Sequence, residues 1–150
     1  MKNVQSSKRA FTLIEVLLVV VIIAILAGIV IIAVNPARQI AQTNNAQRSN
    51  DVRAVLDAVH QFGVDNRGVI PAAISSTGTT VGSGVGQIDI CTDLVPTYVA
   101  EMPFDPNATG SHYTDCTDYD TGYTIMADAD GRITVAAPSA ELSETISITR

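Results

Sequence analysis

One uninterrupted apolar stretch, residues 11–34, constrains this chain more than any other feature. It contains a single charged residue, Glu15. At about 1.5 Å per residue, a helix of this length spans about 36 Å, enough to cross a hydrocarbon core of about 30 Å with some tilt. Because lipid offers no partners for backbone polar groups, we predict a membrane-spanning helix. The basic pair Lys8–Arg9 places its start in the cytoplasm and residues after Asn35 outside.

Glu15 is the anomaly in this stretch. An ionised carboxylate in hydrocarbon costs several kcal/mol unless it is paired. One interpretation is that Glu15 lies close enough to the membrane surface to stay solvated. The other is that an acid inside the membrane has a function, which is the default hypothesis for such residues. Glu15 alone leaves both interpretations open.

The residues before and around Glu15 resemble the processing signature of type IV prepilins. They comprise a basic pair, a small residue, and then Phe-Thr-Leu-Ile-Glu at the start of a long apolar helix. The resemblance implies that a dedicated membrane peptidase cuts between Ala10 and Phe11 and methylates the new Phe11 amine. The family nearly always has glycine before the cut. Because alanine is the smallest alternative, we expect cleavage to persist, and we read residues 1–10 as a leader peptide.

The predicted cut would give Glu15 a partner. It creates a cationic amine on Phe11, four residues before Glu15 and on the same helical face. The carboxylate can pair with the amine of its own chain or with that of a neighbouring chain. A desolvated charge pair of this kind fixes register. The resemblance assigns Glu15 and Phe11 to assembly, where they recruit and align incoming subunits.

An ordinary secretory signal or an uncleaved signal anchor would also place an apolar stretch near the N-terminus. This stretch is far longer than the signal-peptide core of about 7–15 residues, and no clear Ala-x-Ala site follows it. Both alternatives are therefore disfavoured.

The helix is expected to continue beyond the membrane through residues 35–66. Pro36 lacks the N–H that would bond to the preceding turn, which predicts a kink. In relatives the segment between a Gly and a Pro in this region can lose helicity in the filament, and the matching helix break runs from Gly28 to Pro36. Residues 37–50 are polar and predicted to be solvated or subunit-facing. An apolar stripe then predicts a face that packs on a sheet: Val52, Val55, Leu56 and Val59.

Residues 67–150 are predicted to form a globular head. Residues 74–87 are rich in Ser, Thr and Gly and are expected to be a flexible connection. Residues 93–106 resemble a turn shared by pilins and by the pseudopilins of type II secretion, through Leu94, Tyr98, Pro103, Asp105 and Pro106. Three strands are predicted, at 123–127, 132–136 and 145–149, the first two joined by a hairpin turn. The predicted class is α+β, a pilin fold with a long helix packed on a small antiparallel sheet.

Two further features of the head bear on its stability and ligands. Cys91 and Cys116 are the only cysteines, and on the exported side they form either a disulfide or two free thiols. Calcium takes oxygen ligands, and some pseudopilin relatives bind it in comparable loops. The weak calcium candidates, which more commonly form a solvated acidic surface, are Asp115, Asp118, Asp120, Asp128 and Asp130.

Catalysis and nucleic-acid binding are disfavoured by composition. The two histidines, His60 and His112, lie far apart, and no nucleophile or zinc motif is present. The whole chain has 9 basic and 15 acidic residues; without Lys2, Lys8 and Arg9 it keeps 6 basic residues, a net charge of −9. Such a field repels phosphate. Apart from the possible calcium, no cofactor is expected.

We therefore predict a structural subunit of a type IV pilus-like filament. It would be anchored in the cytoplasmic membrane with its head outside, and then become part of an extracellular filament. The resemblance implies four kinds of partner: other copies of the chain, a prepilin peptidase, membrane lipid, and an inner-membrane platform with its ATPase. One alternative is a type II secretion pseudopilin, and a second is an exported binding domain on an uncleaved anchor.

Overall fold

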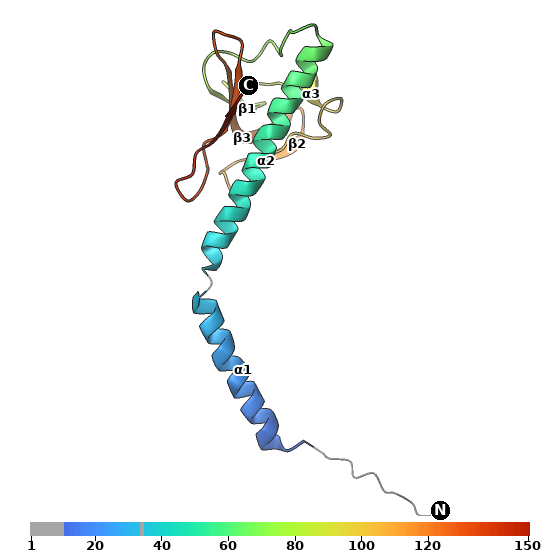
Figure 1. The fold of residues 1–150 in the computed structure, drawn as a ribbon. Coiled ribbons are helices and arrows are strands. Elements are labelled where there is room, and N and C mark those ends of the chain that lie inside the picture. The colour runs from blue at the N-terminus through green and yellow to red at the C-terminus, as the bar shows by residue number, and fades with distance from the viewer. Residues whose placement is uncertain (1–10, 34) are drawn as a thin grey trace, which may run out of the picture. The chain divides into compact units, whose positions relative to one another are not determined.

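The computed structural model describes residues 11–33 and 35–150. Contacts divide the chain into two compact units, the first ending at Ala37 and the second running from Arg38 to Arg150. In the first unit, α1 is a helix over Leu13–Ala33 (Figure 1). Within it, Leu13–Ile31 is long and apolar enough to cross a membrane by length and composition. This agrees with the span predicted from the sequence.

The second helix, α2, covers Pro36–Asp65. Pro36 is its first residue, a position where the missing N–H leaves no helical bond unmade. After Asp65 the helix ends where predicted, because Arg67 and Gly68 adopt positive φ angles of 59° and 90°. The Gly68 N–H donates to the carbonyl of Gly63 at 2.7 Å, which closes the last turn.

The predicted apolar stripe of α2 forms one side of the core. Val52, Leu56 and Val59 are 0% exposed and Val55 is 2% exposed. The stripe also extends further toward the N-terminus than expected. Its extension consists of three buried residues, Ala41, Asn45 and Arg48. Residues 37–50 therefore have one buried face in addition to the solvated or subunit-facing surface that was predicted.

A five-stranded antiparallel sheet supplies the other side of the core. Its strands are β1 (Thr79–Gly82), β2 (His112–Asp115), β3 (Asp118–Ala127), β4 (Ile133–Ala137) and β5 (Ile146–Thr149). The order is β1-β3-β4-β5, and β2 pairs with β3. Alternate residues of β3 are buried, so one face of the central strand joins the core with the stripe of α2. The predicted α+β pilin-like architecture is confirmed.

The sequence prediction found β3, β4 and β5 but missed two strands and a short helix. β1 lies within residues 74–87, so the expected flexible connection is wrong for Thr79–Gly82. Gly82 accounts for the misreading: a Cβ there would collide with the side chain of Gln87 and lie 3.0 Å from the carbonyl oxygen of Tyr119. The glycine is therefore needed for close approach within a sheet. β2 and the helix α3 (Cys91–Leu94) were not predicted.

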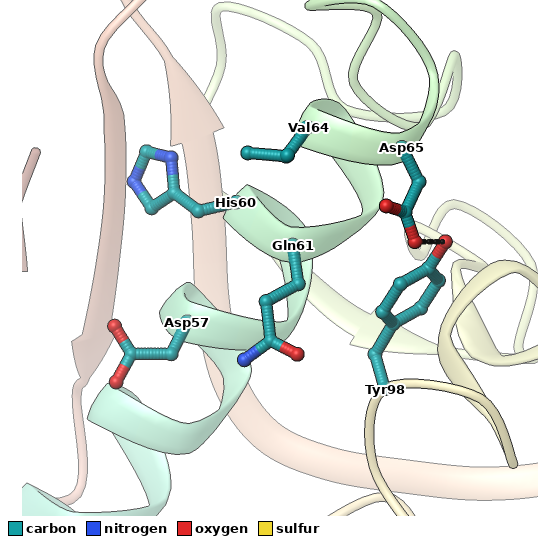
Figure 2. Close-up of a pocket in the computed structure, with 6 residues that line it drawn as sticks. All are labelled: Asp57, His60, Gln61, Val64, Asp65 and Tyr98. Carbon is teal, nitrogen blue, oxygen red and sulfur yellow. Dashed lines mark hydrogen bonds between the residues drawn. The ribbon is translucent and has the colours of Figure 1, made fainter.

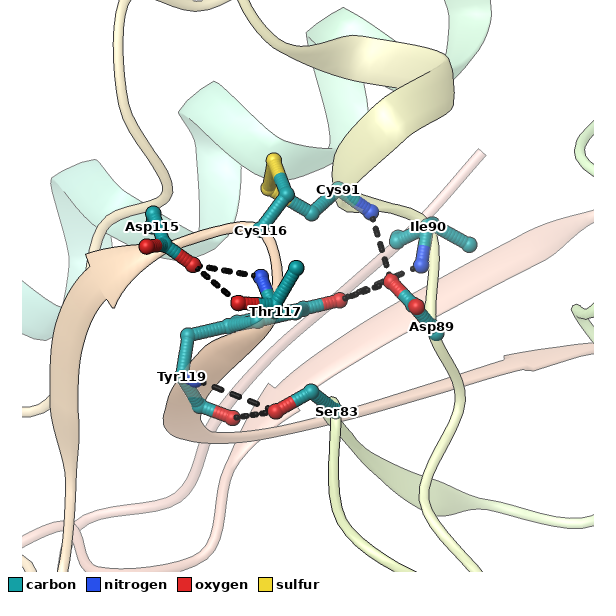
Figure 3. Close-up of a disulfide and its surroundings, with 8 residues drawn as sticks. All are labelled: Ser83, Asp89, Ile90, Cys91, Asp115, Cys116, Thr117 and Tyr119. Atoms are coloured by element: carbon teal, nitrogen blue, oxygen red, sulfur yellow. Dashed lines mark hydrogen bonds between the residues drawn. A yellow bond between two sulfur atoms is a disulfide. The ribbon is translucent and has the colours of Figure 1, made fainter.

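The two cysteines form a disulfide, the first of the two predicted states (Figure 3). It joins the first residue of α3 to the turn between β2 and β3, across a separation of 25 residues. Tyr119 and Asp89 support it: the Tyr119 hydroxyl donates to Asp89 Oδ1 at 2.8 Å, and the Cys91 N–H donates to the same oxygen at 3.2 Å. The bond therefore fixes α3 against the edge of the sheet.

Replacing both cysteines by serine should destabilise the head. For a loop of this length the chain-entropy account gives a loss of about 3–4 kcal/mol in the free energy of unfolding. Denaturant unfolding of the detergent-solubilised chain, followed by circular dichroism, measures it. As a control, a reductant should lower the wild-type stability to that of the double variant and leave the variant unchanged. Equal stability of wild type and variant in the absence of reductant would contradict the prediction.

Candidate functional site

The start of α1 holds the residues that the sequence singled out for processing and assembly. Thr12 caps the helix: its carbonyl oxygen accepts the Glu15 N–H at 3.1 Å, and its Oγ1 accepts the same N–H at 3.3 Å. The spacing Thr-x-x-Glu is that of a capping box. A carboxylate in the first turn also faces the positive end of the helix dipole. Glu15 thus helps to start the helix whatever else it does.

The apolar surface of α1 has no partner within the described chain. Leu13 is 81% exposed and Phe11 is 80% exposed, and no residue of the span Leu13–Ile31 is buried. Leaving this many apolar side chains in water would be costly, at about 1.5–3 kcal/mol for each large side chain. The helix is therefore built to be covered by lipid or by other protein chains.

In the second unit a buried ion pair connects α2 to the head. The Arg48 guanidinium donates from Nε to Asp105 Oδ2 at 2.7 Å and from Nη2 to Asp105 Oδ1 at 3.0 Å. Both residues are 0% exposed. Nη1 donates to Glu141 Oε2 at 2.8 Å and to Asn45 Oδ1 at 2.9 Å. We call Asn45, Arg48, Asp105 and Glu141 the Arg48 cluster.

The Arg48 cluster reaches three segments that are far apart in the sequence. Asn45 binds the loop between β4 and β5: its Nδ2 donates to the Glu141 carbonyl at 2.8 Å, and its Oδ1 accepts the Glu141 N–H at 2.9 Å. Asp105 Oδ1 also accepts the N–H groups of Asn107 and Ala108, both at 2.9 Å. Every charged group of the cluster therefore has several partners, as a buried pair requires.

The cluster shifts the pKa values of its members. Burial by itself would raise the pKa of Asp105, but the hydrogen bonds from Arg48, Asn107 and Ala108 outweigh it and hold that pKa below its usual value. The hydrogen bond from Arg48, helped by one from Asn44, lowers the pKa of Glu141. The hydrogen bonds that Arg48 donates to Asp105 raise the pKa of Arg48 despite the opposing effect of burial. The cluster therefore favours the ionised form of all three groups.

Residues 5–31 match the prokaryotic N-terminal methylation motif. This match is consistent with a type IV pilin-like protein. The match covers the start of α1, including Phe11 and Glu15. The helix followed by an antiparallel sheet also fits a pilin-like protein. The match implies a prepilin-type substrate of the pilin or pseudopilin kind, processed by a prepilin peptidase and assembled into a filament. No curated protein and no solved structure matches the chain.

The remaining N-terminal predictions of this pilin-like chain are placed as follows. Ala10 lies outside the described residues. Gly28 lies inside α1, and no atom comes within 4 Å of the position its Cβ would take. α1 ends at Ala33 and α2 begins at Pro36. Loss of helicity between Gly28 and Pro36 was expected for the filament, and it stays a prediction.

The five candidate calcium ligands bond to other protein groups. Asp118 accepts from His112 at 3.1 Å and Asp120 accepts from Gln87 at 2.7 Å. Asp115 accepts from Thr117, whereas Asp128 and Asp130 both pair with Arg132. Within residues 11–33 and 35–150, no three acidic, histidine or cysteine side chains are grouped as metal ligands would be. Calcium binding therefore stays a prediction.

A hollow of about 380 Å³ lies beside the second half of α2 (Figure 2). The Tyr98 hydroxyl donates to Asp65 at 3.0 Å at one side of it, and His60 and Asp57 lie on the other side. His60 Nε2 is buried without a hydrogen-bond partner in the described part of the chain.

Sequence reasoning missed the Arg48 cluster, although one signal pointed to it. Asn45 and Arg48 continue the spacing of the stripe at Val52 and Val55, so a cation falls on the buried face of an amphipathic helix. A charge at such a position needs a buried partner. Which acid supplies it could not be read from the sequence, because Asp105 lies 57 residues away along the chain.

The Arg48 cluster should make the head sensitive to acid. The pKa of Asp105 is lower in the folded than in the unfolded chain. Its carboxylate therefore contributes fully to the free energy of unfolding above about pH 4, and this contribution is lost as the pH falls through the folded pKa. Asp105→Asn removes the charge that Arg48 needs and should cost about 3–5 kcal/mol at neutral pH. The difference in the free energy of unfolding between wild type and Asp105→Asn should shrink as the pH falls toward about 3. Denaturant midpoints across this range test the prediction, and a difference independent of pH would contradict it.

Proposed function

We propose that this chain is a structural subunit of a type IV pilus-like filament. The observation that supports the proposal is the combination of a methylation motif over residues 5–31 with an apolar helix whose side chains have no partner within the described chain. An anchor needs lipid contact alone. A filament subunit also needs a surface that other copies of the helix can cover, and a device that sets their register.

Glu15 is the proposed register device. After cleavage between Ala10 and Phe11, the Phe11 amine lies four residues before Glu15, just ahead of the start of α1 at Leu13. When helices gather in a medium of low polarity, an unpaired carboxylate is costly, and pairing with the amine of a neighbour is favourable only at one stagger. The cap that Thr12 provides is compatible with this role, because Thr12 binds the backbone N–H of Glu15 and not its carboxylate.

The proposed topology follows from charge. Lys8 and Arg9 precede the span, which places the N-terminus in the cytoplasm and the head outside. The disulfide between Cys91 and Cys116 suits that compartment, because disulfides persist outside the reducing cytoplasm. Extraction of the helix from lipid requires an energy source, so an inner-membrane platform and an ATPase are the proposed partners. The role is structural, without catalysis.

The alternative is a pseudopilin of type II secretion, since the motif serves both kinds of protein. Electron microscopy of cells that express the chain separates them. A pilus subunit should give long filaments that carry the head epitope outside the cell. A pseudopilin should give short assemblies that depend on calcium. An exported domain on an uncleaved anchor should give neither.

Processing should leave a chain that begins at methylated Phe11. Intact mass spectrometry of the membrane-extracted protein measures this. An amine-specific reagent provides a second measurement, because both lysines precede the cut: the precursor has three reactive amines (the N-terminus, Lys2 and Lys8), and the processed chain has only its N-terminus. The control variant Ala10→Gly should be cut at least as completely as wild type. A purified chain that retains residues 1–10 would exclude the proposed processing.

Removing the charge of Glu15 should prevent assembly while leaving the helix intact. Glutamine has nearly the same size as glutamate and also serves at this position of a capping box, so Glu15→Gln isolates the charge. We expect normal cleavage and a loss of at least about tenfold in filament yield. Thr12→Ser keeps the cap and should assemble like wild type. Filaments in normal amount from Glu15→Gln would show that the carboxylate does not set register.

A further inference from the structure

The first half of α2 carries no acidic residue, although the chain has 15 of them. Residues 36–50 contain two charges, Arg38 and Arg48, and Arg48 is buried. The face opposite the core is formed by exposed uncharged residues at spacings of four, three and four, which places them on one side of the helix. We call this surface the amide face, and it consists of Gln39, Thr43, Ala46 and Asn50.

The head covers only one side of this part of α2, the side that carries Ala41, Asn45 and Arg48. On that side Asn44, Asn45 and Arg48 donate hydrogen bonds to Glu141 and Glu144 in the loop between β4 and β5. Ile40 is 62% exposed. The opposite side is polar and exposed, and a polar helix surface of this kind can bridge to another body. The amide face is therefore suited to a partner.

The charge of the chain indicates which partner fits. Residues 68–150 contain 11 acidic residues and two arginines, and both arginines are already paired: Arg132 with Asp128 at 3.0 Å, and Arg150 with Asp57 at 2.8 Å. Two such heads repel each other. When copies are held together by α1, the electrostatic repulsion between neighbouring heads is smallest where one of the two facing surfaces has no carboxylate.

We propose that the amide face is a contact between subunits and receives the acidic head surface of a second copy of this chain. The side-chain amide N–H groups of Gln39 and Asn50 are donors for carboxylate oxygens, and an acid on this face would oppose them. The inference rests on the proposed filament function and names a second contact region for it, separate from the apolar helix.

Gln39→Glu tests the contact. The change keeps the size of the side chain and adds one negative charge in the first turn of α2, where the helix dipole favours an acid. The helix is therefore not weakened. We expect the filament yield to fall about fivefold or more, because like charges meet at each contact, while the amount of processed subunit in the membrane is unchanged. Higher ionic strength should restore part of the yield.

Two variants serve as controls. Gln39→Lys disfavours the helix end but adds the opposite charge, so it should assemble as well as wild type. Gln61→Glu makes the same chemical change in the same helix, at an exposed position already flanked by Asp57 and Asp65, and should also assemble. Normal filaments from Gln39→Glu, or equal losses from Gln39→Glu and Gln39→Lys, would overturn the inference and leave the proposed function standing. Absence of filaments from the wild-type chain would instead overturn the proposed function.

Discussion

The bond between Arg48 and Asp105 determines where the head sits on α2. A wholly buried guanidinium needs a hydrogen-bond acceptor for each of its nitrogens. Here Asp105 accepts from Nε and Nη2, while Glu141 and Asn45 both accept from Nη1. Apolar packing along the stripe at Val52–Val59 provides affinity between helix and sheet but tolerates sliding by a turn. The ion pair removes that freedom, because only one register unites the cation with its acid.

The same pair helps to order the loops of this small head. Asp105 accepts two backbone N–H groups from the residues that follow it, so the segment after Met102 is fixed to the helix. Glu141 accepts a hydrogen bond from Arg48, which fixes the loop between β4 and β5 to the same helix. The disulfide fixes the segment before Leu94. Three connections that lack regular secondary structure are thus each attached at one strong point. Such attachments add to the hydrophobic core formed by α2 and the sheet.

The sequence predicted the elements whose periodicity is long or whose turn chemistry is unambiguous. The span of α1, the stripe of α2 and the hairpin after Ala127 belong to this class. β1 was hidden because its glycine and threonine residues are those of a loop, and only contact with Tyr119 and Gln87 shows why they are needed. The partner of Arg48 was hidden for another reason: pairing over 57 residues is a property of the fold. The N-terminal site was readable because its residues are contiguous.

No residue of α1 contributes to the core of the head, which is formed by α2, α3, the sheet and their connections. Folding of the head and solvation of the first helix are consequently separate events. A subunit of the proposed filament could leave the bilayer, serve in the polymer and return to the lipid with its outer domain native throughout. Disassembly would then yield reusable building blocks, and one pool of molecules could sustain repeated cycles of extension and retraction without new synthesis.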